Sequence, residues 1–336
     1  MTPPATKNTV PALEVVEPGL QTTIQDYPGR LGRQSLGFFP SGPVDHLAFQ
    51  LSNLLVGNNS GAAALEIPLG RFQASLLCDG IIAVCGPDAE LCLNDHPIAT
   101  WEAVPVRAGD RLSCSVIRGT GYRLYLAIAG GIAVPTVFGS RSTFLVAGIG
   151  GNDGRALERA DVLQIDRSTN DHPRRRRVPE SLRPAYPGKW EIEVIRGPHA
   201  DPDFLTAEDY EEFLESSWRC DLNSNRVAVR FNPYRFRWAR SGGDVAGGHP
   251  SNILDSSYPL GGILAYGDVL TILGPDSHTS GGFAVIATVA SASLWKVGQL
   301  RPGRDTVTFR EIDLQQAVAL EEHNHHLLNA KNLELG

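Results

Sequence analysis

Glycine and proline recur along the whole chain, with 35 glycines and 23 prolines among 336 residues. They interrupt the sequence at short intervals, so that short apolar runs lie between them instead of long helical repeats. The runs of strand length are residues 13–16, 75–77, 80–85, 89–93, 111–116, 122–129, 162–165, 190–195, 227–231, 269–273, 284–290 and 306–309. Many short strands of this kind are typical of β-barrels, so we expect a mainly β fold.

Helical patterns are few. Residues 45–55 carry apolar residues at helical spacing, and Asp45 is placed to cap the first turn. Residues 206–216 begin with Thr206 and Asp209, which resemble a capping box. The end of the chain, residues 314–328, has the pattern of a terminal helix with a polar face. We therefore expect a few short helices beside the strands.

The length predicts two domains. Residues 166–189 contain four consecutive arginines and four prolines but almost no apolar pattern, which is typical of a linker. An arginine run can also bind nucleic acid or an acidic partner, but a solvated linker fits better in a chain of net charge −7. The predicted divisions are an N-terminal tail (1–12), a first barrel domain (13–165), the linker (166–189), a second barrel domain (190–312) and a C-terminal helix and tail (313–336). A short echo between residues 107–112 and 301–307 is consistent with two barrels of one kind.

Charge and cysteine content exclude several classes of protein. The net charge argues against nucleic acid and anionic lipid as partners. No apolar run is long enough to span a membrane, and the first ten residues do not resemble a signal peptide, so we expect no membrane partner and no export. The five cysteines form no CxxC pair, which favours free thiols in a reducing cytoplasm.

The common signatures of hydrolases, zinc proteases and nucleotide-binding proteins are absent from the sequence. A first polar cluster contains Gln25, Asp26 and Arg30, followed by Ser41 and Asp45. We interpret it as structural: the first three residues hold two loops together, and Ser41 or Asp45 caps the helix that follows.

A second set of polar residues lies in glycine-rich loops of the other half. Backbone N–H groups in such loops, beside Asn, Arg and Lys, can bind a carboxylate or a small amide. The candidate site residues are Asn223, Asn225, Arg226, His249, Asn252, Asp276, Gly281, Gly282 and Lys296. Bracing of turns explains the same pattern nearly as well. For His323, His325 and His326 we favour a frayed terminal helix over a metal site, and we expect no bound metal.

Taken together, these clusters resemble a known family. The chain is similar, over about residues 13–312, to the carboxyltransferase region of urea carboxylase and to the allophanate hydrolase subunit 2 family, which includes the Kip regulator antagonist and the C subunit of 5-oxoprolinase. The matching pieces include GLQTTIQDYPGRLG (19–32), PSGPVD (40–45), LLVGNNSGAAALE (54–66), AGGIAV (129–134), GSRST (139–143), RGPHADPDF (196–204), NSNR (223–226), WAR (238–240) and HPSN (249–252), with the segment 272–303. HPSN, ILGPD and LWKVGQLRPG are more similar to the urea carboxylase branch.

The resemblance implies tandem cyclophilin-like β-barrel domains and a carboxyltransferase that acts on a small urea- or amide-type substrate. In such enzymes carboxybiotin delivers the carboxyl group to an amide nitrogen, so the protein needs no covalent nucleophile. The implied roles are that Arg226 or Lys296 binds the acceptor's carbonyl or a carboxylate, that Asp276 orients an N–H and is the candidate base, and that the Gly281–Gly282 backbone stabilises developing negative charge. Asn223, Asn225, His249 and Asn252 are expected to bind the substrate.

The sequence contains no biotinylation site, no ATP-binding carboxylase region and no companion cyclophilin-like half. We therefore expect no covalently bound cofactor, carboxybiotin on a biotin carrier protein, and a companion cyclophilin-like subunit on a separate chain. The chain departs from the family at Val227–Ala228, at residues 231–235 and at residues 277–279. A biotin-independent reaction of a repurposed family member, a lactam-opening subunit of the 5-oxoprolinase type and a non-enzymatic partner protein remain alternatives.

Overall fold

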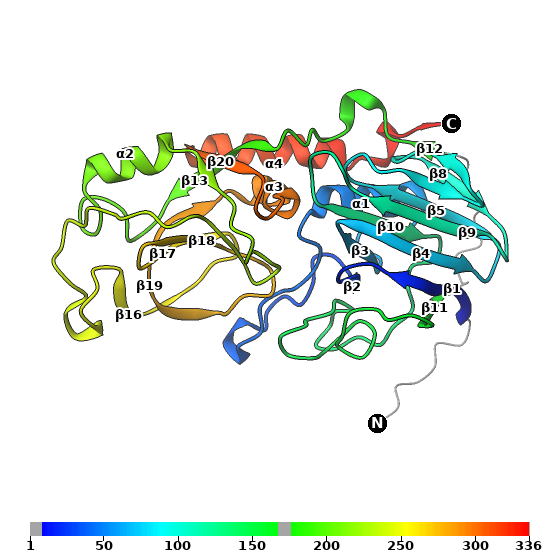
Figure 1. The fold of residues 1–336 in the computed structure, drawn as a ribbon, viewed down its shortest axis with the longest axis horizontal. Helices are drawn as coiled ribbons and strands as arrows, with labels where there is room; N and C mark the ends of the chain where they lie inside the picture. Colours follow the sequence, from blue (N-terminus) through cyan, green and yellow to red (C-terminus); the bar gives the residue numbers. More distant parts are fainter. Residues whose placement is uncertain (1–8, 167–175, 336) are drawn as a thin grey trace. The chain divides into compact units, whose positions relative to one another are not determined.

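The structure is a computed structural model that describes residues 9–166 and 176–335. The chain divides into two compact units. One takes in residues 1–31, 41–186 and 325–336, and the other takes in residues 32–40 and 187–324. Part of the predicted linker 166–189 and most of the predicted N-terminal tail lie outside the described residues, so the domain boundaries drawn from the sequence stay predictions. Figure 1 follows the order of the elements along the chain by colour.

The first unit contains two large sheets and a small one. The six-stranded sheet has the order β11-β1-β4-β9-β6-β7, and the five-stranded sheet has the order β2-β3-β10-β5-β8. Figure 1 labels the strands of both sheets except β6 and β7. A two-stranded sheet joins β12 and β21. The strands are β1 (Thr9–Pro18), β2 (Thr23–Gln25), β3 (Ala64–Pro68), β4 (Gly70–Leu76), β5 (Gly80–Cys85), β6 (Leu91–Leu93), β7 (His96–Ile98), β8 (Ala103–Val106), β9 (Arg111–Val116), β10 (Arg123–Ile128), β11 (Val162–Asp166), β12 (Arg176–Arg177) and β21 (Glu334–Leu335).

Strand β10 shows why strands of the five-stranded sheet can lack the usual alternation of apolar and polar residues. Every residue of β10 is buried, because both faces of this sheet are covered. Leu124 and Leu126 belong to the core that lies between the two large sheets. Tyr125 and Ala127 belong to a second core that contains Phe49 of helix α1 (His46–Leu55). Because successive side chains of a strand point to opposite faces, Leu124 and Leu126 face the six-stranded sheet, whereas Tyr125 and Ala127 face α1.

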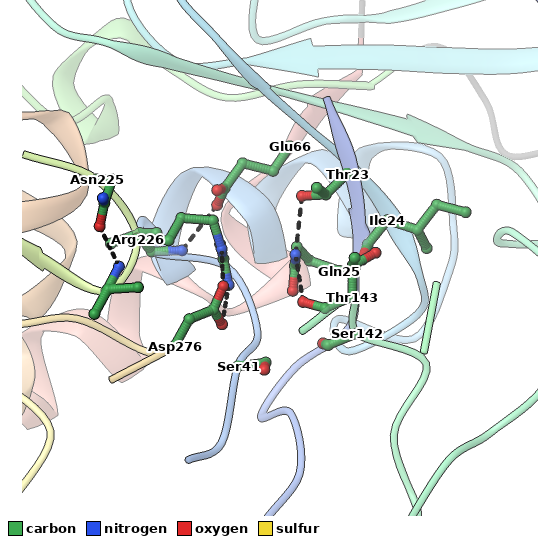
Figure 2. A network of polar contacts seen from close by, with 12 residues as sticks. Thr23, Ile24, Gln25, Ser41, Glu66, Ser142, Thr143, Asn225, Arg226 and Asp276 are labelled. Atoms are coloured by element: carbon green, nitrogen blue, oxygen red, sulfur yellow. Dashed lines mark hydrogen bonds and ion pairs between the residues drawn. The ribbon is translucent and has the colours of Figure 1, made fainter. Parts of the chain in front are cut away.

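The first polar cluster of the sequence is structural, as predicted. The Asp26 carboxylate accepts hydrogen bonds from the backbone N–H groups of Arg141 (2.7 Å) and Ser142 (3.0 Å). Arg30, which is 1% exposed, donates to Ser41 Oγ (3.2 Å) and to the Ser142 carbonyl. The Gln25 amide donates to the Thr143 carbonyl (3.3 Å; Figure 2). These contacts hold the segment 25–30 against the segment 140–143.

The second unit is built on one eight-stranded sheet. Its strand order is β14-β20-β13-β19-β17-β18-β15, with β16 paired to β19. The pairs are antiparallel except for β13 with β20, which are parallel. The strands are β13 (Lys189–Arg196), β14 (Trp218–Arg219), β15 (Ala228–Arg230), β16 (Asn252–Ser257), β17 (Gly262–Tyr266), β18 (Val269–Leu273), β19 (Ser280–Val289) and β20 (Thr306–Glu311).

Helices α1, α2 (Ala207–Glu215) and α4 (Leu314–Leu327) agree with the sequence patterns, whereas the short helix α3 (Leu294–Gln299) was not predicted. Asp45 caps α1, and its Oδ1 accepts from the N–H groups of Leu47 and Ala48. Thr206 caps α2 by accepting from the Asp209 N–H. Helix α3 follows β19, and α4 occupies the predicted terminal helix. None of the helices in the described ranges is long and apolar enough to cross a membrane.

A mainly β fold is confirmed, with 37% strand and 17% helix. The prediction of closed barrels is not confirmed, because in the described residues each sheet runs between two different edge strands instead of closing on itself. The strands β5, β9 and β18 match their predicted runs, whereas β3, β8, β16 and β17 were not predicted. Short apolar runs indicate strands, but they do not specify which strands pair or whether the pairing closes.

Candidate functional site

Arg226 and Asp276 form a buried ion pair in the second unit. Arg226 Nε lies 2.7 Å from Asp276 Oδ2 and Nη2 lies 3.0 Å from Oδ1, so the guanidinium binds both carboxylate oxygens (Figure 2). The two side chains are only 4% and 2% exposed. Such two-bond pairs are both strong and geometrically specific.

Hydrogen bonds also fix the backbone of the two segments that carry Arg226 and Asp276. Asn225 Oδ1 accepts from the N–H of Val227 at 2.8 Å, which holds the turn before β15 (Figure 2). The Gly274 N–H donates to the Val227 carbonyl, and the Asp276 N–H donates to the Arg226 carbonyl. A Cβ atom at Gly274 would lie 2.1 Å from the Arg226 carbonyl oxygen, so only glycine allows this approach. The pair and its backbone therefore brace two loops.

Lys296 lies on α3 and is bound to β13. Its Nζ donates to Glu193 Oε2 (2.7 Å) and to the Glu191 carbonyl (2.9 Å). Glu193 also accepts from Arg310 at 2.9 Å and from the Ser293 hydroxyl. Burial raises the pKa of Glu193, but the hydrogen bonds from Lys296 and Ser293 outweigh this effect, so its pKa lies below the ordinary value. Glu193 was missed in the sequence, where it stands inside a strand pattern with nothing to mark its partner.

The strand register brings these residues to one end of the sheet. Ala228, at the start of β15, pairs with Leu273, at the end of β18. The Gly261 N–H donates to the Leu273 carbonyl, and the next residue, Gly262, pairs with Thr288 near the end of β19. The loops that carry Asn225, Arg226, Asp276 and Lys296 all leave the sheet at this end.

Four of the predicted site residues are placed elsewhere. His249, Asn252, Gly281 and Gly282 lie on or beside β16 and the start of β19, where Asn252 pairs with Phe283. The other end of β17, at Tyr266 and Gly267, faces this region, because the Gly267 N–H donates to Ser251 Oγ. The two ends of β17 are roughly 13 Å apart at about 3.3 Å per residue. The nine candidates therefore do not form the single cleft expected from the sequence.

Local contacts account for His249 and Gly281. His249 Nδ1 lies 2.8 Å from Ser251 Oγ, and its ring meets the Trp238 ring edge-on at 5.8 Å. A Cβ atom at Gly281 would lie 2.9 Å from the Tyr258 ring, so this glycine makes room for a buried side chain. Asn223 is also locally bound, since its side-chain amide donates to Asp221 Oδ1 at 2.9 Å.

Among the described residues, no group of three His, Cys, Asp or Glu side chains is placed to hold a metal ion. All five cysteines are free thiols, and three of them, Cys85, Cys114 and Cys220, are buried.

Comparison with known proteins agrees with the resemblance seen in the motifs. The family model described as carboxyltransferase domain, subdomain A and B, matches residues 36–311. A urea amidolyase of Lachancea kluyveri is 42% identical over 93% of this chain, which spans 17% of that protein's length. The C subunit of the 5-oxoprolinase of Escherichia coli is 32% identical over 91% of this chain and 93% of its own length.

Solved structures give the same relationship. The crystal structure of the Kluyveromyces lactis urea carboxylase superposes with a TM-score of 0.91 at 40% identity, and the match covers 99% of this chain and 30% of that one. The family model spans most of the chain, and the 5-oxoprolinase relative is matched along nearly its full length. The resemblance inferred from the motifs is thereby confirmed, and the chain belongs to the carboxyltransferase domain family, subdomains A and B.

Proposed function

We propose that this chain is the acceptor-binding part of a carboxyltransferase for a small urea- or amide-type molecule, with carboxybiotin carried by a separate chain. The observation that carries the proposal is the placement of Asn225, Arg226, Asp276 and Lys296 at one end of the second unit's sheet. The higher identity to urea amidolyases, 40–42% against 30–32% for the 5-oxoprolinase relatives, favours a urea-like acceptor.

The chemistry required of this chain is orientation and proton transfer at nitrogen. Bound carboxybiotin would supply the activated carboxyl group. An ionised carboxylate has about four lone-pair sites, and Arg226 uses two of those of Asp276. The remaining two can accept an N–H of the acceptor, so we assign Asp276 the role of orienting that N–H and receiving its proton.

Lys296 is assigned to the carbonyl oxygen of the acceptor. An ammonium group has three donors, and among the described residues two are used, by Glu191 and Glu193. The side chain is 20% exposed, so the third donor can reach a bound molecule. Because Gly281 and Gly282 lie at the other end of β17, we leave them out of this proposed site.

The test supplies carboxybiotin from an isolated biotin carboxylase, with ATP, radiolabelled bicarbonate and free biotin, and offers urea and simple amides as acceptors. Label should enter one of these acceptors only when this chain, or its complex with a companion subunit, is present. Asp276→Asn should lower the rate per folded molecule by about 100-fold or more, which is the size of a lost general base.

The matched controls are Asp255→Asn and Lys189→Met, which change exposed residues of the same sheet. They should keep the rate of the unchanged protein. A rate per folded molecule that is also unchanged in Asp276→Asn and Lys296→Met would show that both residues only brace the fold. Absence of transfer to every acceptor by a complete complex would refute the proposed function itself.

The alternative favoured by a separate observation is a lactam-opening subunit. The C subunit of the 5-oxoprolinase of Escherichia coli is 32% identical to this chain and is matched along 93% of its own length. Release of glutamate from 5-oxoproline, dependent on ATP and on companion subunits, would support this alternative in the same set of assays.

A further inference from the structure

A cavity of about 460 Å³ opens in the first unit where three loops converge. The loop between β5 and β6 contributes Asp88 and Glu90, the residues after β7 contribute Thr100, and the turn after β9 contributes Arg118. Arg183 lines the same cavity from a distant part of the chain. The volume falls in the range of about 300–1,000 Å³ that is usual for small-molecule sites.

The charged groups of this cavity are of both signs. In the part of the chain that the structure describes, neither Asp88 nor Glu90 has a basic group within 4.0 Å, although two arginines line the same cavity. Arg183 is half-buried, and its Nε donates to the Val178 carbonyl at 2.9 Å. Within the same described ranges, its guanidinium has no carboxylate partner. Asp88, Glu90 and Arg183 share the cavity without pairing with one another, so these three groups are available to a ligand of matching charge.

Apolar surface lies beside these charges. Ile98 is half-buried and Val116 is 38% exposed, and both residues line the cavity. Thr100 and Ser115, which both carry hydroxyl groups, also line the cavity. A ligand that satisfies the whole lining therefore carries a carboxylate, an ammonium group and a short aliphatic part.

We propose that this cavity binds a free α-amino acid with an aliphatic side chain. Its carboxylate would meet Arg183, with Arg118 nearby, its ammonium group would meet Asp88 and Glu90, and its side chain would lie on Ile98 and Val116. The site belongs to the first unit alone and does not depend on the proposed carboxyl transfer.

The probe is L-leucine, titrated by calorimetry against the full chain, with leucinamide and N-acetyl-leucine as ligands that lack one charge each. A charge-assisted contact contributes about 1.5–3 kcal/mol, so loss of either charge should weaken binding by about 10-fold or more. Arg183→Gln should weaken the binding of leucine but not that of leucinamide. Asp88→Asn combined with Glu90→Gln should weaken the binding of leucine but not that of N-acetyl-leucine.

Arg111→Gln and Asp95→Asn change exposed residues of the same unit that do not line the cavity, and they should leave affinity unchanged. The acidic residues of the cavity are exposed, so their replacement should leave the fold intact; circular dichroism checks Arg183→Gln. Leucine that does not saturate the protein by about 50 mM, well above a millimolar Kd, would overturn the proposal. Equal affinities of leucine for the cavity variants and the two controls would overturn it as well.

Discussion

Arg226 and Asp276 lie 50 residues apart in the sequence and form a two-bond ion pair that is almost completely buried. The pair joins the turn before β15 to the turn after β18, two segments that are also linked by backbone hydrogen bonds. Desolvation of two charges is expensive, so the stability of this contact depends on each group keeping its partner. The same residues thus serve the fold and, in our proposal, the acceptor.

Removal of one partner of this pair should be strongly destabilising. Arg226→Met leaves Asp276 as an unpaired buried carboxylate, and we expect the free energy of unfolding to fall by about 3–5 kcal/mol. The double variant Arg226→Met with Asp276→Leu should be more stable than Arg226→Met alone, because the unpaired carboxylate of Asp276 is removed as well. Urea denaturation of the set measures both effects, with Asp255→Asn as the exposed control. A double variant that loses the sum of the two single losses would contradict this account.

The effects of substituting Lys296 and Glu193 on the free energy of unfolding should depend on each other in the same way. This dependence should be weaker, because Lys296 is partly exposed. Lys296→Met removes one of the donors to a buried carboxylate that Arg310 and Ser293 still bind. We expect a loss of about 1–3 kcal/mol, most of which is recovered when Glu193→Gln is added. Lys189→Met changes another residue of β13, the strand that carries Glu193, and it should have little effect on stability. Independent losses from the two changes would show that the pair contributes nothing of its own.

His199 should make stability depend on pH. Its Nδ1 accepts the Val285 N–H at 3.1 Å, and burial, followed by the charge of Arg240, lowers its pKa below 6.5. The unfolded chain therefore binds the proton more readily, so this contribution to stability is complete above about pH 6.5 and is lost as the pH falls below that value.

The measurement is the difference in unfolding free energy between the unchanged protein and His199→Asn, which retains an acceptor but does not titrate. That difference should be constant above pH 6.5. Below pH 6.5 the unchanged protein should lose stability relative to His199→Asn. The exposed His96→Asn serves as the reference substitution. A difference that does not vary between pH 7 and pH 5 would be inconsistent with a neutral, accepting His199.

The thiols should react in two classes. Cys78 and Cys92 are half-buried, whereas Cys85, Cys114 and Cys220 are buried. Burial, followed by the charge of Cys92, raises the pKa of the Cys114 thiol to about 12, which disfavours the reactive thiolate. An aromatic disulfide reagent should label Cys78 and Cys92 first in the folded protein and all five thiols after denaturation. Detection of any cystine-linked peptide in unreduced protein would contradict the prediction.

Some features were predictable from the sequence because their causes are local. The glycine-punctuated apolar runs indicated a mainly β fold, and Asp45 and Thr206 marked their helix starts because a capping side chain bonds the backbone only a few residues away. The role of Asp26 and Arg30 in holding two loops was also predicted. The ordered motifs indicated the family.

Strand pairing could not be predicted in the same way. Strand β3 is buried at every position and so lacks the alternation that marks a half-exposed strand. The prediction of closed barrels depended on which strands lie at the edges, and hydrogen bonds between distant strands decide that arrangement. The nine candidate site residues do not form a single cleft for the same reason, since the register of β17 places Gly281 and Asp276 at different ends of the sheet.

The sequence alone therefore determined the fold class, the helix starts and the family, because these follow from neighbouring residues and from the order of short motifs. Only the tertiary structure decided that Arg226 binds Asp276, that Lys296 binds Glu193, and that Asp88, Glu90 and Arg183 line one cavity. A contact across 50 or more residues is set by strand order and register, and the energy of a charge depends on the burial and the partner that it finds there.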